Sequence, residues 1–226
     1  MKLLIGIPAF NESEMIDKVL RSFPKKISKI SKIDILVVDD GSTDNTGKIS
    51  RLAGATVLTH LLNRGLGGAL KTIFAYARIN KYDILVTFDA DGQHKASDLP
   101  KIIHQVSSGF ADVVIGTRWM GTKIKPITRL LVNKIANIVT FFLFGVYTSD
   151  SQSGFRVFNK KAIEMIKLKT DGMEVSSEFF KEIKRHKLRF AEIPIETIYT
   201  DYSITKGQRI SDAPNILFRL ILRLLE

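Results

Sequence analysis

The stretch Tyr82-Asp-Ile-Leu-Val-Thr-Phe-Asp-Ala-Asp91 combines a short apolar run with two carboxylates that follow it directly. The run from Ile84 to Phe88 is typical of a buried strand. Asp89 and Asp91 are therefore expected just beyond the edge of a sheet, where open α/β sheets bind ligands. Carboxylate oxygens are hard ligands for a divalent cation that also holds phosphates, so the pair indicates a metal bound to a diphosphate. The alternative for an isolated Asp-x-Asp is a turn or a helix N-cap.

The chain around this stretch alternates between strand and helix patterns. The expected strands are residues 2–7, 33–38, 55–59, 84–88 and 113–115. Between them, helices are expected to begin near Asn11, at Thr43 or Asp44, at Gly65 and at Ser97, each next to capping or turn residues. This alternation predicts an α/β fold with a mostly parallel sheet and helices on both faces.

The second half of the chain is less regular. A helix is expected over 126–147, another after Asn159 and a third after Ser176 or Ser177, with strands over 188–193 and 195–199. The end of the chain, 213–226, is predicted as an amphipathic helix. We expect a single domain over 1–226, with a nucleotide-binding half (1–116) and an acceptor-binding half (117–226).

Composition excludes several classes of protein. The 226 residues contain no cysteine, which rules out disulfides, zinc thiolates and thiol nucleophiles. The net charge of +11 indicates anionic partners. Because no nucleic-acid-binding signature accompanies the scattered lysines, phosphates or acidic lipids are favoured over nucleic acid. An expected strand begins almost at Met1, so no signal peptide is expected.

Carboxylates follow several of the expected strands: Glu12 after the first, Asp39 and Asp40 after the second, and the Asp89–Asp91 pair after 84–88. Each alone is consistent with a cap or a turn. Together they fall on one edge of a parallel sheet and predict a nucleotide site. The absence of G-x-G-x-x-G after the first strand, and of a P-loop, argues against dinucleotide and Walker-type binding.

These strand-end residues belong to a series of motifs in a characteristic order. The motifs are Pro8-Ala-Phe-Asn-Glu12, Val37-Val-Asp-Asp-Gly-Ser-Thr-Asp44, Asn63-Arg-Gly-Leu-Gly67, Asp89-Ala-Asp-Gly-Gln-His94, Gly116-Thr-Arg118 and Asp150-Ser-Gln-Ser-Gly-Phe-Arg156. These motifs cover about residues 1–160, and in them the chain resembles the family 2 glycosyltransferases, whose fold is the Rossmann-like GT-A fold. Within that family the chain looks like the dolichyl-phosphate and polyprenyl-phosphate sugar synthases.

The resemblance implies a site for a nucleotide sugar formed by strand-end residues, with a nucleoside pocket in which carboxylates accept hydrogen bonds. The implied donor-binding residues are Pro8, Ala9, Phe10, Asn11, Glu12, Val38, Asp39, Asp40, Gly67, Asp89, Ala90, Asp91 and Lys206. The implied metal is Mg²⁺ or Mn²⁺, held by Asp91 and Gln93 with Asp89 beside them. The implied catalytic residues are Asp89, Asp91, Arg118, Arg129 and Asp150.

The acceptor decides which further groups the reaction needs. A lipid monophosphate is already largely ionised near neutral pH, so it needs cations and no strong base. Arg118, Arg129, Lys206 and Arg209 are candidates for those cations. A hydroxyl acceptor in glycan or cell-envelope polysaccharide synthesis would need a carboxylate base. Asp150, Glu174 and Glu178 are the candidates for that base.

The donor stays open among UDP-glucose, UDP-N-acetylglucosamine and GDP-mannose. The segment Tyr199-Thr-Asp-Tyr-Ser-Ile-Thr-Lys-Gly-Gln208 departs from the Arg-rich segment of the mannosyl branch, and Glu174-Val-Ser-Ser-Glu178 is similar to glucosyl or N-acetylglucosaminyl members. The resemblance implies a reaction that inverts the configuration of the sugar. A sugar nucleotidyltransferase and a non-enzymatic basic module are the alternatives from other classes.

The apolar stretch 135–147 is interpreted either as a core helix or as a helix that lies in a membrane interface. Arg129 and Lys134 beside it favour the interface, and 213–226 would make a second contact. We therefore expect a cytoplasmic protein, peripheral on the cytoplasmic face of the membrane. Its expected partners are a nucleotide sugar, a polyprenyl or dolichyl phosphate and the membrane surface.

Overall fold

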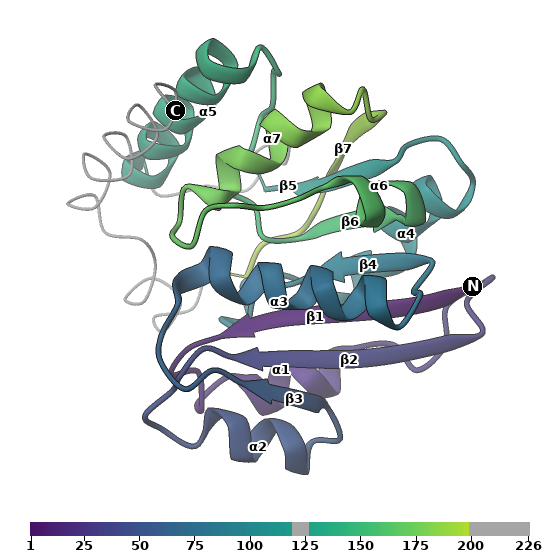
Figure 1. Ribbon diagram of the computed structural model, residues 1–226, viewed down its shortest axis with the longest axis vertical. Coiled ribbons are helices and arrows are strands. Elements are labelled where there is room, and N and C mark those ends of the chain that lie inside the picture. The colour runs from purple at the N-terminus through teal and green to yellow at the C-terminus, as the bar shows by residue number, and fades with distance from the viewer. Residues whose placement is uncertain (119–126, 199–226) are drawn as a thin grey trace.

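The computed structural model describes residues 1–118 and 127–198. Its centre is a seven-stranded sheet in the order β3-β2-β1-β4-β6-β5-β7 (Figure 1). The strands are β1 (Lys2–Ala9), β2 (Lys32–Asp39), β3 (Thr56–Thr59), β4 (Ile84–Thr87), β5 (Val113–Thr117), β6 (Arg156–Asn159) and β7 (Phe190–Pro194). Only β6 runs antiparallel to its neighbours β4 and β5, so the predicted mostly parallel sheet is confirmed.

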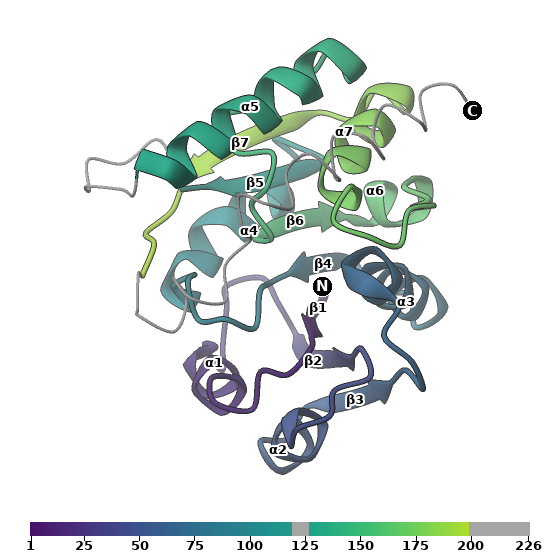
Figure 2. The same ribbon diagram turned by 90° about the vertical axis from the view of Figure 1, so that its left-hand side faces the viewer.

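Helices cover both faces of the sheet, as expected (Figure 2). Their bounds are α1 (Ile16–Ser22), α2 (Thr46–Leu52), α3 (Gly65–Ile79), a 3₁₀ turn at Ala96–Asp98, α4 (Leu99–Ser107), α5 (Ile127–Phe144), α6 (Lys160–Met165) and α7 (Val175–Arg185). Helices α1, α2 and α4 pack on one face around a core that includes Ile5 and Phe88. Helices α3, α6 and α7 pack on the other around Phe74 and Phe158.

The expected starts of the helices agree with the structure at some positions and not at others. Asn159 caps α6 as predicted, since its side chain accepts a hydrogen bond from the Ala162 amide. Asp44 accepts one from the amide of Thr46, the first residue of α2. Ser97 makes no cap for α4, because it lies within the preceding 3₁₀ turn. Ser176 and Ser177 lie inside α7 and are buried, so the prediction that this helix follows them is wrong.

The order of the strands indicates where along the sheet a ligand is expected to bind. From β1 the chain proceeds to β2 and β3 on one side, and β4 then returns to the other side of β1. The crevice outside the carboxyl ends of β1 and β4 is thus a topological switch point, where open α/β sheets bind their ligands. The segments that follow these two strands contain Phe10 and Asp89, so the fold itself brings the strand-end motifs together.

Candidate active site

The loops after β1 and β2 form one fixed unit. Pro8 and Ala9 pair in register with Val38 and Asp39, so the two strands end side by side. Beyond them, the Asn11 amide donates to Ser42 Oγ at 2.9 Å. The amide of Glu12 likewise donates to Thr46 Oγ1 at 2.7 Å, while Phe10 is 43% exposed. The structure therefore brings the predicted nucleoside-pocket residues together and leaves an aromatic face accessible beside them.

Asp40 has a different environment from the one expected of a nucleoside ligand. Its buried carboxylate accepts the amides of Arg64 and Gly65, at 3.0 and 2.8 Å, and lies 2.6 Å from His60 Nδ1. These contacts occupy both oxygens and fix the start of α3, where orphan amides need acceptors. Asp39 is also buried and accepts the Ser42 amide at 3.1 Å. In this structure both carboxylates organise the loops around the pocket.

Gly67, predicted to bind the donor, packs against the chain that precedes α7. Its amide donates to the carbonyl oxygen of Asp171 at 2.7 Å. A Cβ at this position would overlap the carbonyl oxygen of Thr170, so only glycine permits this close approach. The position therefore joins α3 to the segment that precedes α7.

Asp89 follows β4 and is held from several sides. His94 Nε2 lies 2.9 Å from Asp89 Oδ2, and the His94 side chain is fully buried. A Cβ on Gly154 would overlap the Asp89 carboxylate, so this glycine makes room for it. Burial opposes ionisation of Asp89, but the His94 hydrogen bond and the positive charges of Arg118 and Arg156 together lower its pKa.

Asp91 has the opposite electrostatic setting. Burial and the neighbouring negative charge of Asp89 raise the pKa of Asp91 above its ordinary value. Its two oxygens accept the Gln93 amide at 2.9 Å and Gln93 Nε2 at 2.7 Å. Asp89 and Asp91 thus repel one another, and Gln93 lies against Asp91.

This donor set fits a divalent cation. A cation would relieve the repulsion between Asp89 and Asp91, and their oxygens are the ligands that Mg²⁺ and Mn²⁺ take. Among the described residues no group of three or more His, Asp or Glu side chains could hold a metal ion. A site with one or two carboxylates is the usual protein share when substrate phosphates supply other ligands.

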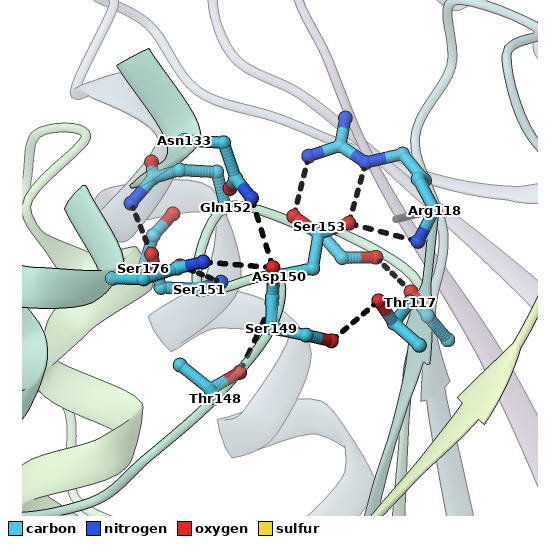
Figure 3. Close-up of polar contacts among 12 residues, drawn as sticks. Thr117, Arg118, Asn133, Thr148, Ser149, Asp150, Ser151, Gln152, Ser153 and Ser176 are labelled. Carbon is cyan, nitrogen blue, oxygen red and sulfur yellow. Dashed lines mark hydrogen bonds and ion pairs between the residues drawn. The ribbon is translucent and has the colours of Figure 1, made fainter. Parts of the chain in front are cut away.

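Arg118 and Asp150 form an ion pair at the end of β5 (Figure 3). Arg118 Nε and Nη2 each donate to a carboxylate oxygen at 2.8 Å, and the Arg118 amide donates to Asp150 Oδ2 at 3.0 Å. Asp150 is completely buried, whereas the Arg118 side chain is 16% exposed. The pair uses one edge of the guanidinium and directs Nη1 away from Asp150.

Arg156 is a buried charge that the residue patterns did not single out. Its Nη2 donates to the Ser151 carbonyl oxygen at 3.0 Å, its Cζ lies 4.4 Å from the Phe179 ring centroid, and its Nε has no hydrogen-bond partner. Burial lowers the pKa of Arg156 to about 10, against the opposing effect of Asp89 and Asp150. An arginine inside the apolar run Phe155-Arg-Val-Phe158 was the signal that could have revealed it.

The remaining predicted residues are dispersed. Glu178 accepts the amides of Lys169 and Thr170 and the hydroxyl of Thr170, and Glu174 is buried at the start of α7. Arg129 belongs to α5, but its side chain lies outside the described part. Lys206, Arg209 and the expected helix 213–226 also lie outside the described residues. In the part of the chain that is described, no helix is long and apolar enough to cross a membrane.

A family model described as glycosyl transferase family 2 matches residues 4–166 of the chain. An uncharacterized protein of Methanocaldococcus jannaschii is 41% identical over 98% of this chain and 92% of its own length. The UDP-N-acetylglucosamine–dolichyl-phosphate N-acetylglucosaminyltransferase of Methanococcus voltae is 34% identical over 96% of this chain and 93% of its own length.

Structural comparison finds the same fold in glucosyl-3-phosphoglycerate synthase from Mycobacterium tuberculosis, solved with Mn²⁺, UDP-glucose and phosphoglyceric acid. The TM-score is 0.75, with 99% of this chain and 78% of that chain covered. The sequence identity is 18%, so this similarity concerns the fold.

Proposed function

Because the chain belongs to glycosyl transferase family 2, has the GT-A fold and is a glycosyltransferase, we propose that its acceptor is a polyprenyl or dolichyl phosphate. It would transfer one hexose from a nucleotide sugar, with inversion at the anomeric carbon. The relative from Methanococcus voltae is named for a transfer to dolichyl phosphate, and the two chains align over nearly their full lengths.

The contacts of the candidate base carboxylates favour a phosphate acceptor. Asp150, a candidate base for a hydroxyl acceptor, is completely buried and paired with Arg118 on both of its oxygens. Glu178, a second candidate, accepts hydrogen bonds from the backbone and side chain of Thr170. A carboxylate engaged in this way is a poor proton acceptor for a substrate. A phosphate acceptor fits because it already has its negative charge.

The cationic groups then have a defined task. Two anions, the donor diphosphate and the acceptor phosphate, must approach the same anomeric carbon. Arg118, whose guanidinium is oriented by Asp150, would contact an anionic oxygen, a task that suits the planar fork of arginine. Arg156 supplies a second, buried positive charge that interacts electrostatically with Asp89 and Asp150. Arg129, Lys206 and Arg209 stay candidates for further contacts to phosphate.

The leaving group is activated at the opposite side of the site. Asp91, with Asp89 and Gln93 beside it, would hold Mg²⁺ or Mn²⁺. When bound, the ion would offset the charge that develops on the departing nucleotide. Asp89, fixed by His94 and Gly154, would face the sugar and the diphosphate. For the donor we favour UDP-N-acetylglucosamine, the nucleotide sugar in the name of the Methanococcus voltae relative.

Helix α5 suits a peripheral position on the cytoplasmic face of the membrane. It lies at the outside of the fold, against α7 (Figures 1 and 2). Ile135, Ile138 and Phe142 are exposed, Phe142 to 79%, and Lys134 lies beside them. An apolar face with a neighbouring cation is suited to an anionic lipid surface. Flotation with anionic vesicles tests this contact, and retention of flotation by Phe142→Glu would argue against it.

A panel of donors tests the proposed reaction. The protein is incubated with Mn²⁺, a polyprenyl phosphate and labelled UDP-N-acetylglucosamine, UDP-glucose or GDP-mannose, and the label that enters the organic phase is counted. We expect transfer from UDP-N-acetylglucosamine. Label from another donor would change the sugar and keep the reaction class. No organic label from any donor, with turnover onto a soluble glycan, would reject the lipid acceptor.

A further inference from the structure

We propose that Asn137 of helix α5 is a positioning residue that holds the backbone on both sides of Asp150 and thereby fixes the guanidinium of Arg118. The inference rests on the proposed function, because that function gives Arg118 its anionic ligand. The described contacts form a short path from Asn137 through the 149–151 loop to Asp150 and then to Arg118.

The first step of this path is a two-sided amide contact. Asn137 Nδ2 donates to the carbonyl oxygen of Ser149 at 2.7 Å, and the Ser151 amide donates to Asn137 Oδ1 at 2.9 Å. One side chain thus pairs with the two residues that flank Asp150. Both distances are those of well-formed hydrogen bonds. A single planar amide that binds both neighbours restrains the position and the orientation of the peptide units between them.

The second step leads from the loop to Arg118. The Asp150 side chain is completely buried, so it has little freedom to compensate for a shift of its own backbone. Its carboxylate receives the backbone amide and two guanidinium nitrogens of Arg118 at 2.8–3.0 Å. A displacement of the 149–151 loop would therefore lengthen these bonds and release the guanidinium from its fixed orientation.

The inward face of α5 supports this interpretation. A helix at the surface of a protein usually turns its apolar side chains inward. Here Asn133, Asn137 and Thr140 make polar contacts with the interior, whereas Ile138 and Phe142 are exposed. Asn133 Nδ2 also donates to the Ser149 carbonyl oxygen, at 2.9 Å. Among the side chains of α5 that the structure describes, both Asn133 and Asn137 therefore contact the loop that contains Asp150.

Other contacts would keep the loop folded when Asn137 is replaced. Glu192 on β7 accepts the Ser149 amide at 2.9 Å and the Thr148 hydroxyl at 2.6 Å. Ser149 Oγ lies 2.7 Å from Thr117 Oγ1 (Figure 3). A change at Asn137 should therefore loosen Asp150 and leave the sheet intact.

The test compares Asn137→Ala and Asn137→Asp with Thr140→Val. Asn137→Ala removes both bonds, and Asn137→Asp keeps an acceptor for the Ser151 amide but loses the donor to Ser149. Thr140→Val is the matched control, because it removes an inward polar contact of the same helix that goes to Ser177 on α7. Amide exchange at Arg118 and Ser151 is followed by NMR, and transfer kinetics are measured with a polyprenyl phosphate.

We expect exchange of the Arg118 amide to become at least about tenfold faster in both Asn137 variants and to stay unchanged in Thr140→Val. We also expect kcat to fall about tenfold to a hundredfold, with an unchanged KM for the donor, as for other outer residues that orient a functional group. Unchanged exchange at Arg118 in a folded Asn137 variant would overturn the proposal. Because exchange needs no substrate, a wild type inactive on lipid phosphates would reject the proposed function alone.

Discussion

Arg118 and Asp150 are paired edge to edge, with Nε and Nη2 of the guanidinium each 2.8 Å from a different carboxylate oxygen. The carboxylate is completely buried, and the arginine is partly exposed. The buried carboxylate of Asp150 therefore fixes the orientation of the Arg118 guanidinium. In the proposed function, Arg118 is the partner that would contact an anionic substrate.

Asp150→Asn should therefore lower both the stability of the protein and its rate of transfer. Removing one partner of a buried pair costs about 3–5 kcal/mol, because the other charge is left without compensation. We expect a lower free energy of unfolding and a loss of kcat with a lipid phosphate of at least about tenfold. Urea unfolding and initial rates measured below the unfolding transition test the two effects.

Arg118→Lys should also lose activity, since an ammonium cannot form the paired bonds. An active Arg118→Lys variant would contradict the assigned role.

Gly154→Ala tests the placement of Asp89. The added Cβ would overlap the Asp89 carboxylate, and relieving such a contact costs about 1–3 kcal/mol. We expect transfer to be lost and the free energy of unfolding to fall. In an Asp89→Ala background the same substitution should cost much less, because the overlapping atoms are gone. A double-mutant cycle by urea unfolding measures this coupling. Equal costs in both backgrounds would show that the carboxylate lies elsewhere.

Asp91→Ala should remove the effect of the metal on donor binding. In the wild type, a nucleotide diphosphate with Mn²⁺ should raise the melting temperature, since a ligand at about 100 times its Kd adds about 2.7 kcal/mol of stability. The Asp91 variant and wild type with EDTA should both lose most of this shift. The control is the variant alone, whose own melting temperature shows that it folds. An undiminished Mn²⁺-dependent shift would place the metal on other residues.

Asp112, which lies just before β5, should make the stability of the protein depend on pH. Hydrogen bonds from Arg189, outweighing the effect of burial, hold the pKa of Asp112 well below its usual range. Its stabilising contribution is therefore present above the unfolded pKa of about 3.9 and is lost as the pH falls toward the lower folded value. Asp112→Asn should lower the urea midpoint at pH 7 and pH 5, with a smaller difference at pH 3. A difference that does not depend on pH would contradict this account.

The fold could be predicted from the sequence to the extent that each strand was a distinct apolar run. Strand β6 was missed because the buried, charged Arg156 interrupts its apolar run. Prediction of α7 failed at its start, because Ser176 and Ser177 looked like caps but are covered by the core. A local sequence pattern shows the spacing of the apolar residues in a segment. It does not show which other helix or strand will pack against that segment.

The sequence was enough to predict where the candidate site lies, but not which groups each carboxylate contacts. The strand-end rule predicted that Glu12, Asp89 and Asp91 lie at one edge of the sheet. The same rule could not show that Asp40 would face the start of α3, or that Asp150 would be taken up by Arg118. Those contacts join segments more than twenty residues apart, and only the folded chain determines them.

The most direct measurement compares two acceptors that differ in a single group. Polyprenyl phosphate and the corresponding polyprenol are presented in the same detergent, with Mn²⁺ and labelled UDP-N-acetylglucosamine, and the labelled lipid is counted. Because the buried, paired Asp150 is unsuited to act as a base, we predict labelled product from the phosphate and none above background from the alcohol. Equal or greater transfer to the polyprenol would contradict a phosphate acceptor.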